Sequence, residues 1–229
     1  MVIKRLKGTA WIAYEDGRGV LIDAGLKAQS KLMKRKLDKL DIDLQYILMT
    51  HTHYDHTGAT EQIRAATGAK VVVGAAEAEC LKCGHTDVPR GTNAFWRMIG
   101  NAGHDVDPKH IEHYTPVKGD VVLIEAHTSL EIGSELIEAI PLGAHSVGSV
   151  GYRIDEHIFV GDVVFGIAHV VYPWFADFEE DIEAAWGAII ESGAKYIYPG
   201  HGRRLSVEYL RRKRDERYKS NSKKESKNV

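Results

Sequence analysis

The sequence predicts an α/β domain in which helices cover β-sheets. Short apolar runs rich in β-branched residues alternate with amphipathic stretches, and this order is typical of a sheet with helices packed on it. The chain has 229 residues, 44% hydrophobic and 27% charged, which is enough for one good-sized domain. Its two halves follow a similar order of strands, a polar loop rich in metal-binding residue types, and a helix.

The first half begins with a predicted hairpin at residues 10–25, where two β-rich runs flank a turn that contains glycine. Residues 30–41 show the apolar stripe of an amphipathic helix. The remaining elements of this half are a buried strand at 44–50, a helix ended by glycine at 59–68, and a strand at 69–74.

Residues 83–118 differ from their surroundings, because they are rich in turn formers and contain one apolar knot at 94–99. We interpret this segment as an insertion or lid. The second half of the domain then continues with strand signals at 120–124, 129–142, 149–156 and 157–165, an amphipathic helix at 178–192, and a last strand at 194–200.

The net charge of −2 is unevenly distributed. From Arg203 to Val229 the chain carries eleven Lys/Arg and four Asp/Glu, and almost no apolar residue follows Leu210. We therefore predict a single domain over residues 1–210 and, over 211–229, a helix that frays into a basic, disordered tail. The alternative is an arm that binds nucleic acid or another anionic partner.

Other features limit the location of the protein. No apolar run approaches the roughly 18 residues of a membrane span, and the N-terminal stretch lacks the apolar region of a signal peptide. The two cysteines, Cys80 and Cys83, cannot form a disulfide scaffold, which favours a reducing cytoplasm. With His85 they form a candidate for a structural zinc site, but a fourth ligand is not evident.

The stretch "THTHYDHTG" at residues 50–58 concentrates metal-binding side chains directly after a predicted strand. His51 and His53 are two residues apart, so in extended backbone they point the same way and can bind one ion. Asp55 and His56 follow as the chain turns into the next helix, where they can bind a second ion. Imidazole and carboxylate ligands suit zinc, manganese or iron.

One loop supplies too few ligands for two ions, and three other strand ends offer the rest. His145 lies in "PLGAHSVGS", Asp162 in "HIFVGDVVF" and His201 in "YIYPGHG". Each is a polar residue near glycine, which lets another part of the backbone approach closely.

Together the segments "HTHYDHTG … GAHSVGS … VGDVVF … YPGHG" resemble the metallo-β-lactamase-fold hydrolase superfamily in order and spacing. Within it, the chain is most similar to small hydroxyacylglutathione hydrolase (glyoxalase II)-like proteins. The resemblance extends from "GVLIDAG" to "PGHG" and implies an αββα four-layer sandwich with the metal site at one edge of the two sheets. It does not extend to the C-terminal extension that holds glutathione.

The resemblance also implies the ligand sets. A first metal would be bound by His51, His53 and His145, a second by Asp55, His56 and His201, with Asp162 bridging them. Asp23, in "LIDAG", would support the metal loop from behind. We therefore expect two divalent ions per chain, zinc in the first place, with manganese or iron as alternatives.

Two such cations, about 3.5–4 Å apart, share a water and lower its pKa towards about 7. The expected reaction is attack of the metal-bound hydroxide on the carbonyl of a small ester, thioester or lactone. Asp162 is expected to be catalytic because it holds the two ions together. Asp55 is the second catalytic candidate, since it can steer the nucleophile or pass a proton to the leaving group.

In this superfamily the segment after the bridging aspartate lines the substrate mouth. His169, Tyr172, Trp174 and Phe175 are therefore candidate substrate contacts, with packing of an aromatic cluster under a loop as the alternative. Tyr54, inside the metal loop, is a further candidate.

Two other activities stay open: a metal-dependent nuclease or phosphodiesterase that uses the basic tail, and an iron-dependent sulfur dioxygenase. The expected partner is a small-molecule substrate. A homodimer is possible, and a membrane partner is not expected.

Overall fold

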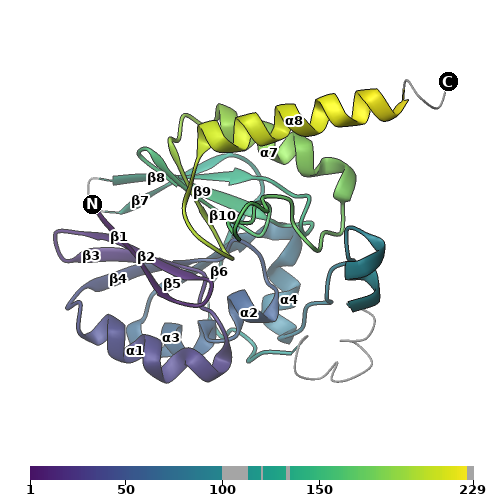
Figure 1. Ribbon diagram of the computed structural model, residues 1–229. Coiled ribbons are helices and arrows are strands. Elements are labelled where there is room, and N and C mark those ends of the chain that lie inside the picture. Colours follow the sequence, from purple (N-terminus) through teal and green to yellow (C-terminus); the bar gives the residue numbers. More distant parts are fainter. Residues whose placement is uncertain (100–112, 120, 133–134, 226–229) are drawn as a thin grey trace.

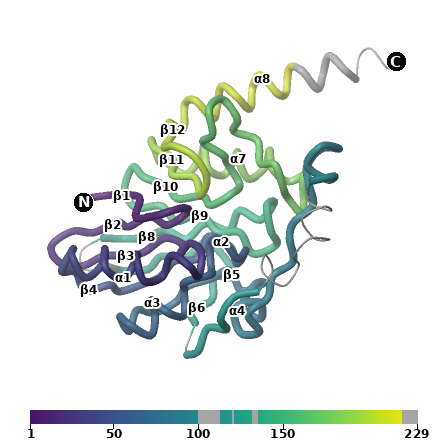
Figure 2. The backbone as a smooth tube through the Cα atoms, turned by 60° about the horizontal axis from the view of Figure 1, so that its bottom comes forward, coloured from purple at the N-terminus to yellow at the C-terminus, as the bar shows by residue number. Residues whose placement is uncertain are grey.

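Two six-stranded sheets lie face to face in the computed structural model, and helices cover the outer face of each (Figure 1). The structure describes residues 1–99, 113–119, 121–132 and 135–225. The layers are helix, sheet, sheet and helix, as the predicted αββα sandwich requires. In Figure 2, α1, α3 and α4 lie on one side of the pair of sheets, and α7 and α8 lie on the other.

The first sheet has the order β1-β2-β3-β4-β5-β6. Its strands are β1 (Val2–Lys7), β2 (Ala10–Glu15), β3 (Arg18–Ile22), β4 (Asp43–Leu48), β5 (Lys70–Gly74) and β6 (Val121–Ile124). The expected hairpin is formed by β2 and β3. Asp16 and Gly17 form its two-residue turn with φ of 47° and 75°, the left-handed backbone of a type I′ turn. From β3 to β6 the strands run parallel.

The helices of the first half are α1 (Ser30–Asp38), α2 (Tyr54–Thr57), α3 (Thr60–Thr67) and α4 (Ala78–Cys83), with short 3-10 turns at Lys27–Gln29 and Ala75–Glu77. The apolar stripe of α1 buries Met33 and Leu37 against the sheet. In the same core, α3 contributes Ile63 and α4 contributes Leu81. The helix α2 is a single turn that directly follows the histidine loop.

The second sheet has the order β12-β11-β10-β9-β8-β7. Its strands are β7 (Thr128–Ile132), β8 (Glu135–Pro141), β9 (Val150–Ile154), β10 (His157–Gly161), β11 (Tyr196–Pro199) and β12 (Leu205–Ser206). A 3-10 turn at Glu179–Asp181 leads into α7 (Ile182–Glu191), and α8 (Val207–Glu225) follows β12. Trp186 and Ile189 of α7 pack under this sheet with Leu210 of α8.

A third apolar cluster fills the space between the two sheets and joins the halves of the domain. It contains Trp11 and Ile22 from the first sheet, and Tyr152, Phe159 and Tyr198 from the second. Three buried clusters thus occupy the three interfaces of the four layers.

The predicted insertion is described on both sides of residues 100–112, which lie outside the described residues. Its apolar knot forms a helical segment at 94–99. Before it, the side chain of Thr92 donates hydrogen bonds to the carbonyl oxygens of Pro173 and Trp174, and Gly91 forms a β-bridge with Phe175. The insertion is therefore joined to the segment that precedes α7.

The C-terminal region forms one long helix. We expected a helix that frays into a disordered tail over residues 211–229, and α8 extends to Glu225. Ion pairs one turn apart stabilise a helix that has little apolar surface; Lys213 pairs with Glu216 at 2.8 Å, and Arg211 with Glu208 at 3.4 Å. Arg217 additionally pairs with Glu183 of α7 at 2.9 Å. The division into a domain over 1–210 and a separate tail stays a prediction.

Among the described residues, no helix combines the length and the hydropathy needed to cross a membrane.

Candidate metal centre

The seven predicted ligands meet at one edge of the two sheets, although they come from four separate loops. His51 and His53 follow β4, and Asp55 and His56 belong to α2. The other three lie on the second sheet, at the ends of β8, β10 and β11: His145, Asp162 and His201. All seven side chains belong to groups of three whose ligand atoms lie within 4.8 Å of one another, and Asp162 forms one such group with His51 and His56.

The first set consists of His51, His53 and His145, all buried. Their ring centroids lie 4.6 to 4.8 Å apart. Nδ1 of His53 and Nε2 of His145 are only 3.0 Å apart. His145 uses its other nitrogen, Nδ1, to donate a hydrogen bond to the carbonyl oxygen of Phe175 at 2.8 Å. Its Nε2 therefore carries a lone pair in the neutral ring, and this lone pair faces the other two histidines.

The second set joins Asp55, His56 and His201. Nε2 of His201 lies 3.0 Å from Asp55 Oδ2 and 3.3 Å from Asp162 Oδ2. The other oxygen of Asp162 lies 3.3 Å from Nε2 of His56. Asp162 thus lies between His56 and His201 and, through its set with His51, reaches the first group as well. This is the position that a bridging carboxylate needs.

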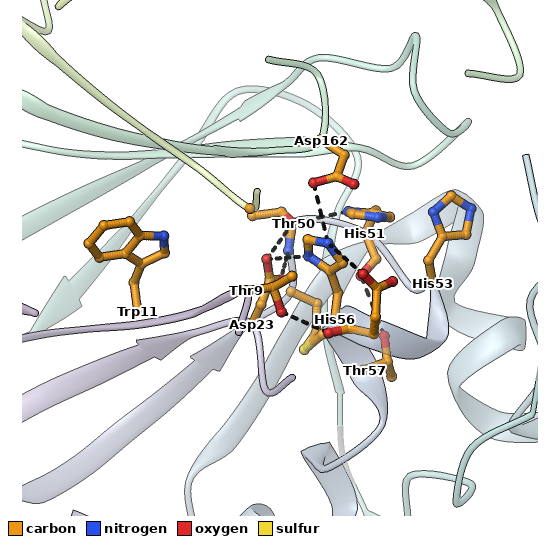
Figure 3. Close-up of polar contacts among 12 residues, drawn as sticks. Thr9, Trp11, Asp23, Thr50, His51, His53, His56, Thr57 and Asp162 are labelled. Carbon is orange, nitrogen blue, oxygen red and sulfur yellow. Dashed lines mark hydrogen bonds and ion pairs between the residues drawn. The ribbon is translucent and has the colours of Figure 1, made fainter. Parts of the chain in front are cut away.

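Asp23 lies directly behind this centre, on the opposite side of the His56 ring from Asp162 (Figure 3). Its Oδ2 accepts hydrogen bonds from Nδ1 of His56 at 2.7 Å and from the Thr50 hydroxyl at 2.8 Å, and its Oδ1 accepts the Thr50 N–H at 2.8 Å. The Thr50 oxygen, in turn, lies 3.1 Å from Nδ1 of His51. One buried carboxylate therefore sets the tautomers of two histidines, leaving Nε2 of each as the free lone pair.

The polar atoms left over inside the centre are the test of whether its residues fit metal ions. Nε2 of His51, His53 and His56 and Oδ1 of Asp162 are buried and have no hydrogen-bond partner among the described residues. Buried polar atoms are nearly always paired, and an unpaired one costs roughly 1–3 kcal/mol. All four are electron-pair donors that belong to the candidate ligand groups. Such a donor set fits divalent zinc, manganese or iron.

Two glycines allow the loops to meet. A Cβ on Gly161, whose φ is +54°, would lie 2.4 Å from Oγ1 of Thr50. A Cβ on Gly200 would lie 2.4 Å from Oδ1 of Asp162 and 2.5 Å from Cε1 of His56. Any side chain at either position would push the ligands apart, as the glycine-flanked strand ends predicted.

The electrostatics of the centre divide the histidines into two kinds. Burial lowers the pKa of His53 from 6.5 to about 3, and His145 beside it adds to the effect. By contrast, the Asp162 carboxylate raises the pKa of His201 to about 10. Burial would raise the pKa of Asp162 itself, but His201 and His56 outweigh it and hold that pKa well below its usual range. The carboxylates thus stay ionised, and positive charge is favoured on their side of the centre.

Glu77 was not predicted from the sequence. It is buried and lies in the 3-10 turn after β5. Its Oε2 accepts hydrogen bonds from the Thr52 N–H at 2.8 Å and the Thr52 hydroxyl at 2.9 Å, and its Oε1 accepts the Gly148 N–H at 3.2 Å. Thr52 separates His51 from His53, and Gly148 belongs to the loop of His145. Glu77 therefore connects the two loops that form the first set; the only signal was a glutamate in the apolar stretch "VVVGAAEA".

Arg5 was also missed. Its guanidinium donates hydrogen bonds to the carbonyl oxygens of Pro199, Gly200 and Gly202, at 3.1, 2.7 and 2.6 Å, and it stacks on the Trp11 ring at 4.1 Å. These contacts hold the loop that carries His201. No sequence pattern marks Arg5, since its partners are backbone atoms far along the chain.

A cavity of about 320 Å³ opens onto the centre, and its lining includes His53, Asp55, His145, Asp162 and His201. The predicted substrate contacts Tyr54, Trp174 and Phe175 also line it. Their contact with a substrate stays a prediction.

The structure does not bring Tyr172 and His169 to this cavity. Tyr172 packs on Trp186 of α7, its hydroxyl donates to Glu179 at 3.1 Å, and Arg217 covers its ring at 3.9 Å. It is therefore part of the helix-side packing. His169 is exposed on the loop before it. The aromatic cluster that the sequence suggested is thus divided, because only Trp174 and Phe175 face the centre.

The cysteine site is not supported by the described residues. Among the described residues, none of the side-chain groups that could hold a metal ion contains Cys80, Cys83 or His85. The Cys83 thiol donates to the carbonyl oxygen of Glu79 at 3.0 Å, and His85 pairs with Asp87 at 2.9 Å.

The comparisons with known proteins agree with this geometry. The family model of the metallo-beta-lactamase superfamily matches residues 3–201. The chain belongs to this superfamily. The crystal structure of the BLEG-1 B3 metallo-beta-lactamase superposes with a TM-score of 0.68 over 87% of this chain and 89% of that one, at 21% identity, and so confirms the fold.

The curated relatives match a smaller part of this chain. A protein named "Probable polyketide biosynthesis zinc-dependent hydrolase BaeB", from Bacillus velezensis, is 25% identical over 130 residues, or 57% of this chain. A hydroxyacylglutathione hydrolase of Shewanella pealeana is 27% identical over 152 residues, or 66% of this chain. The matched regions cover 43% and 38% of these relatives, so the chain spans less than half of their length.

Proposed function

We propose that this protein is a metal-dependent hydrolase that uses two divalent ions to attack the carbonyl of a small ester, thioester or lactone. The observation that carries the proposal is the set of buried electron-pair donors on His51, His53, His56 and Asp162, which make no hydrogen bond and lie together with the side chains of Asp55, His145 and His201. The names of the curated relatives, a zinc-dependent hydrolase and hydroxyacylglutathione hydrolases, support the same activity.

His51, His53 and His145 would hold the first ion, and Asp55, His56 and His201 the second, with Asp162 between them. Zinc is the first candidate, with manganese or iron as alternatives. Divalent ions in such a site polarise a carbonyl oxygen and lower the pKa of water towards about 7. Asp23 and Glu77 have no part in the bond changes; they fix the orientations of the histidines.

In the proposed reaction, the water oxygen bonds to the carbonyl carbon, and the bond from that carbon to the leaving oxygen or sulfur breaks. One water proton must reach the leaving atom. Asp55 lines the cavity, and although burial raises its pKa, His56 and His201 hold the net pKa below the usual range. As an ionised carboxylate it can accept the proton from water and pass it on.

The test combines metal analysis with a substrate panel. Protein reconstituted separately with zinc, manganese and iron should bind close to two ions per chain. It should then hydrolyse at least one ester, thioester or lactone faster than a β-lactam or a phosphodiester. Absence of bound metal after reconstitution would refute the proposal, as would turnover of phosphodiesters alone.

The phosphodiesterase alternative depends on the basic C-terminal region. Part of its charge is already compensated, because Arg211, Lys213 and Arg217 have acidic partners. Affinity for RNA or DNA that falls with rising salt would favour this alternative. Activity restricted to the iron-loaded protein would instead favour a dioxygenase.

A further inference from the structure

The cavity at the metal centre has walls of one chemical kind. Apart from Tyr54 and the metal ligands, its described lining consists of Val88, Pro89, Ile99, Phe165, Trp174 and Phe175. No lysine or arginine is among the lining residues that the structure describes. We propose that the enzyme acts on carbonyl compounds whose bound portion is neutral and apolar, in particular aromatic; this inference rests on the hydrolase function proposed above.

The aromatic wall begins at the ligands themselves. The Phe165 ring lies 5.5 Å from the ring of His201, and Trp174 meets Phe165 edge-on at 5.3 Å. Trp174 in turn stacks on Trp96 at 4.3 Å with an angle of 15° between the rings. An apolar group next to the reacting carbonyl would therefore contact the aromatic rings of Phe165, Trp174 and Phe175, with Trp96 supporting Trp174 from outside the cavity.

The wall is also fixed in place. The carbonyl oxygen of Phe175 accepts the hydrogen bond from His145, so this residue is tied directly to a metal ligand. The N–H of Thr92 donates to the carbonyl oxygen of Trp174 at 2.9 Å, and the N–H of Ala176 donates to that of Arg90 at 2.8 Å. Backbone contacts therefore join the described part of the insertion to the segment that carries Trp174 and Phe175. In Figure 1 this part of the insertion is drawn in teal beside the chain that leads into α7.

The volume is sufficient for an aromatic ring. An engineered apolar cavity of about 150 Å³ takes one benzene molecule. At about 320 Å³, this cavity has room for a ring together with the carbonyl that reacts. A carboxylate in the same place would lose its hydration without gaining a lysine or arginine partner from the described lining.

The ring can enter on either side of the bond that breaks, and a pair of isomeric esters distinguishes these cases. Methyl phenylacetate carries the ring on the acyl side, and benzyl acetate carries it on the alcohol side. Methyl acetate lacks the ring. Methyl (4-carboxyphenyl)acetate, whose ring carboxyl group is free, places a negative charge on the ring. Each kcat/KM of the metal-loaded enzyme is divided by the rate constant for hydroxide-catalysed hydrolysis of the same ester, to remove differences in intrinsic reactivity.

We expect the corrected kcat/KM of at least one isomer to exceed that of methyl acetate ten-fold or more. The corrected kcat/KM of the carboxylated ester should be at least ten-fold lower than that of methyl phenylacetate. Trp174→Ala should lower the value for the preferred isomer at least ten-fold more than the value for methyl acetate. Met98→Ala is the matched control, because Met98 is 61% exposed and lies beside Ile99 without lining the cavity. Ile99→Lys should reduce the difference in corrected kcat/KM between the charged ester and methyl phenylacetate, because it places a cation in the cavity lining.

A binding measurement separates this inference from the proposed hydrolysis. Phenylacetamide should quench the fluorescence of the Trp96–Trp174 pair at concentrations at least ten-fold lower than acetamide does. If no carbonyl compound is hydrolysed but this preference holds, the hydrolase proposal fails and the apolar site stands. If esters are hydrolysed with equal corrected kcat/KM, or the charged ester is preferred, the apolar site is wrong and the hydrolase proposal stands.

Discussion

Replacing Glu77 by glutamine tests whether the metal centre depends on a carboxylate that does not bind metal. The amide has nearly the same shape, so the change alters charge and hydrogen bonding without leaving a cavity. A glutamine oxygen in the position of Oε2 can still accept both bonds from Thr52. The NH2 group must then face the Gly148 N–H, and two donors oppose each other across the 3.2 Å now spanned by a hydrogen bond.

The expected cost follows from these contacts. Leaving the buried Gly148 N–H unsatisfied costs about 1–3 kcal/mol, and the bonds from Thr52 weaken because their acceptor is no longer charged. We expect Glu77→Gln to lower the free energy of unfolding of the metal-free protein by about 2–4 kcal/mol. Because the loops of His51, His53 and His145 are then held less firmly, the affinity for the first metal should fall roughly 10–100-fold.

Urea unfolding of the metal-free protein measures the first quantity, and competition with a chromophoric chelator measures the second. Glu79→Gln is the matched control: Glu79 belongs to the adjacent helix, its side chain is 80% exposed, and it pairs only loosely with Lys82 at 3.5 Å. It should change neither quantity measurably. If Glu77→Gln binds the first metal within two-fold of the wild type, Glu77 supports the fold but does not position the ligands.

Further predictions concern the centre, its support and the C-terminal helix. Asp162→Ala should abolish hydrolysis and lower the bound metal below two ions per chain, while circular dichroism still shows the α/β fold; activity near wild type would exclude a bridging role. Asp23→Asn should impair metal binding by at least ten-fold, because it removes the acceptor that sets the tautomers of His51 and His56; unchanged affinity would show that Thr50 alone suffices. In the metal-free protein, the pKa of His53 is lowered to about 3. The folded state therefore has a contribution to its stability that is complete above pH 6.5 and is lost as pH falls from 6.5 towards 3. The pKa of His201 is raised to about 10. Its contribution to the stability of the folded state is complete below pH 6.5 and is lost as pH rises through 10. Urea midpoints measured with a chelator present should therefore be highest near pH 6.5, and a steady rise from pH 6 to 10 would contradict these pKa shifts. Deleting residues after Lys219 should change kcat/KM for a small neutral ester less than two-fold, and a ten-fold loss would show that this end of the chain contributes to the site.

The clustering of the candidate ligands could be predicted because their residue types and spacing are visible in short segments of the sequence. His51, His53 and His56 lie within six positions, and each remaining ligand stands alone at a strand end near glycine. Their supports are of another kind. Arg5 acts on backbone oxygens nearly two hundred positions away, and Glu77 acts on one N–H in each of two loops. Neither contact leaves a pattern in the sequence, since a backbone partner has no residue type.

The sequence was less informative where the partners of a residue lie far along the chain. Tyr172 and Trp174 are two residues apart, and the sequence offered no means to tell which of them faces the centre. The structure assigns Tyr172 to Trp186 and Arg217, both of which come from helices later in the chain. The length of α8 could not be predicted from its few apolar residues, because the ion pairs along the helix and the acidic partner on α7 contribute to its stability.

The centre also explains why metal and protons should compete for this protein. Three carboxylates, Asp23, Asp55 and Asp162, lie within 3.8 Å of His56, and burial removes the water that would otherwise screen them. Without a metal, protons on His56 and His201 supply the missing positive charge, which is why the pKa of both is raised. A divalent ion supplies that charge while using the same nitrogen lone pairs, so binding must release these protons. The second ion, which His56 and His201 would hold, should therefore bind more tightly as pH rises, whereas the first set, whose histidines are already neutral, should depend on pH much less.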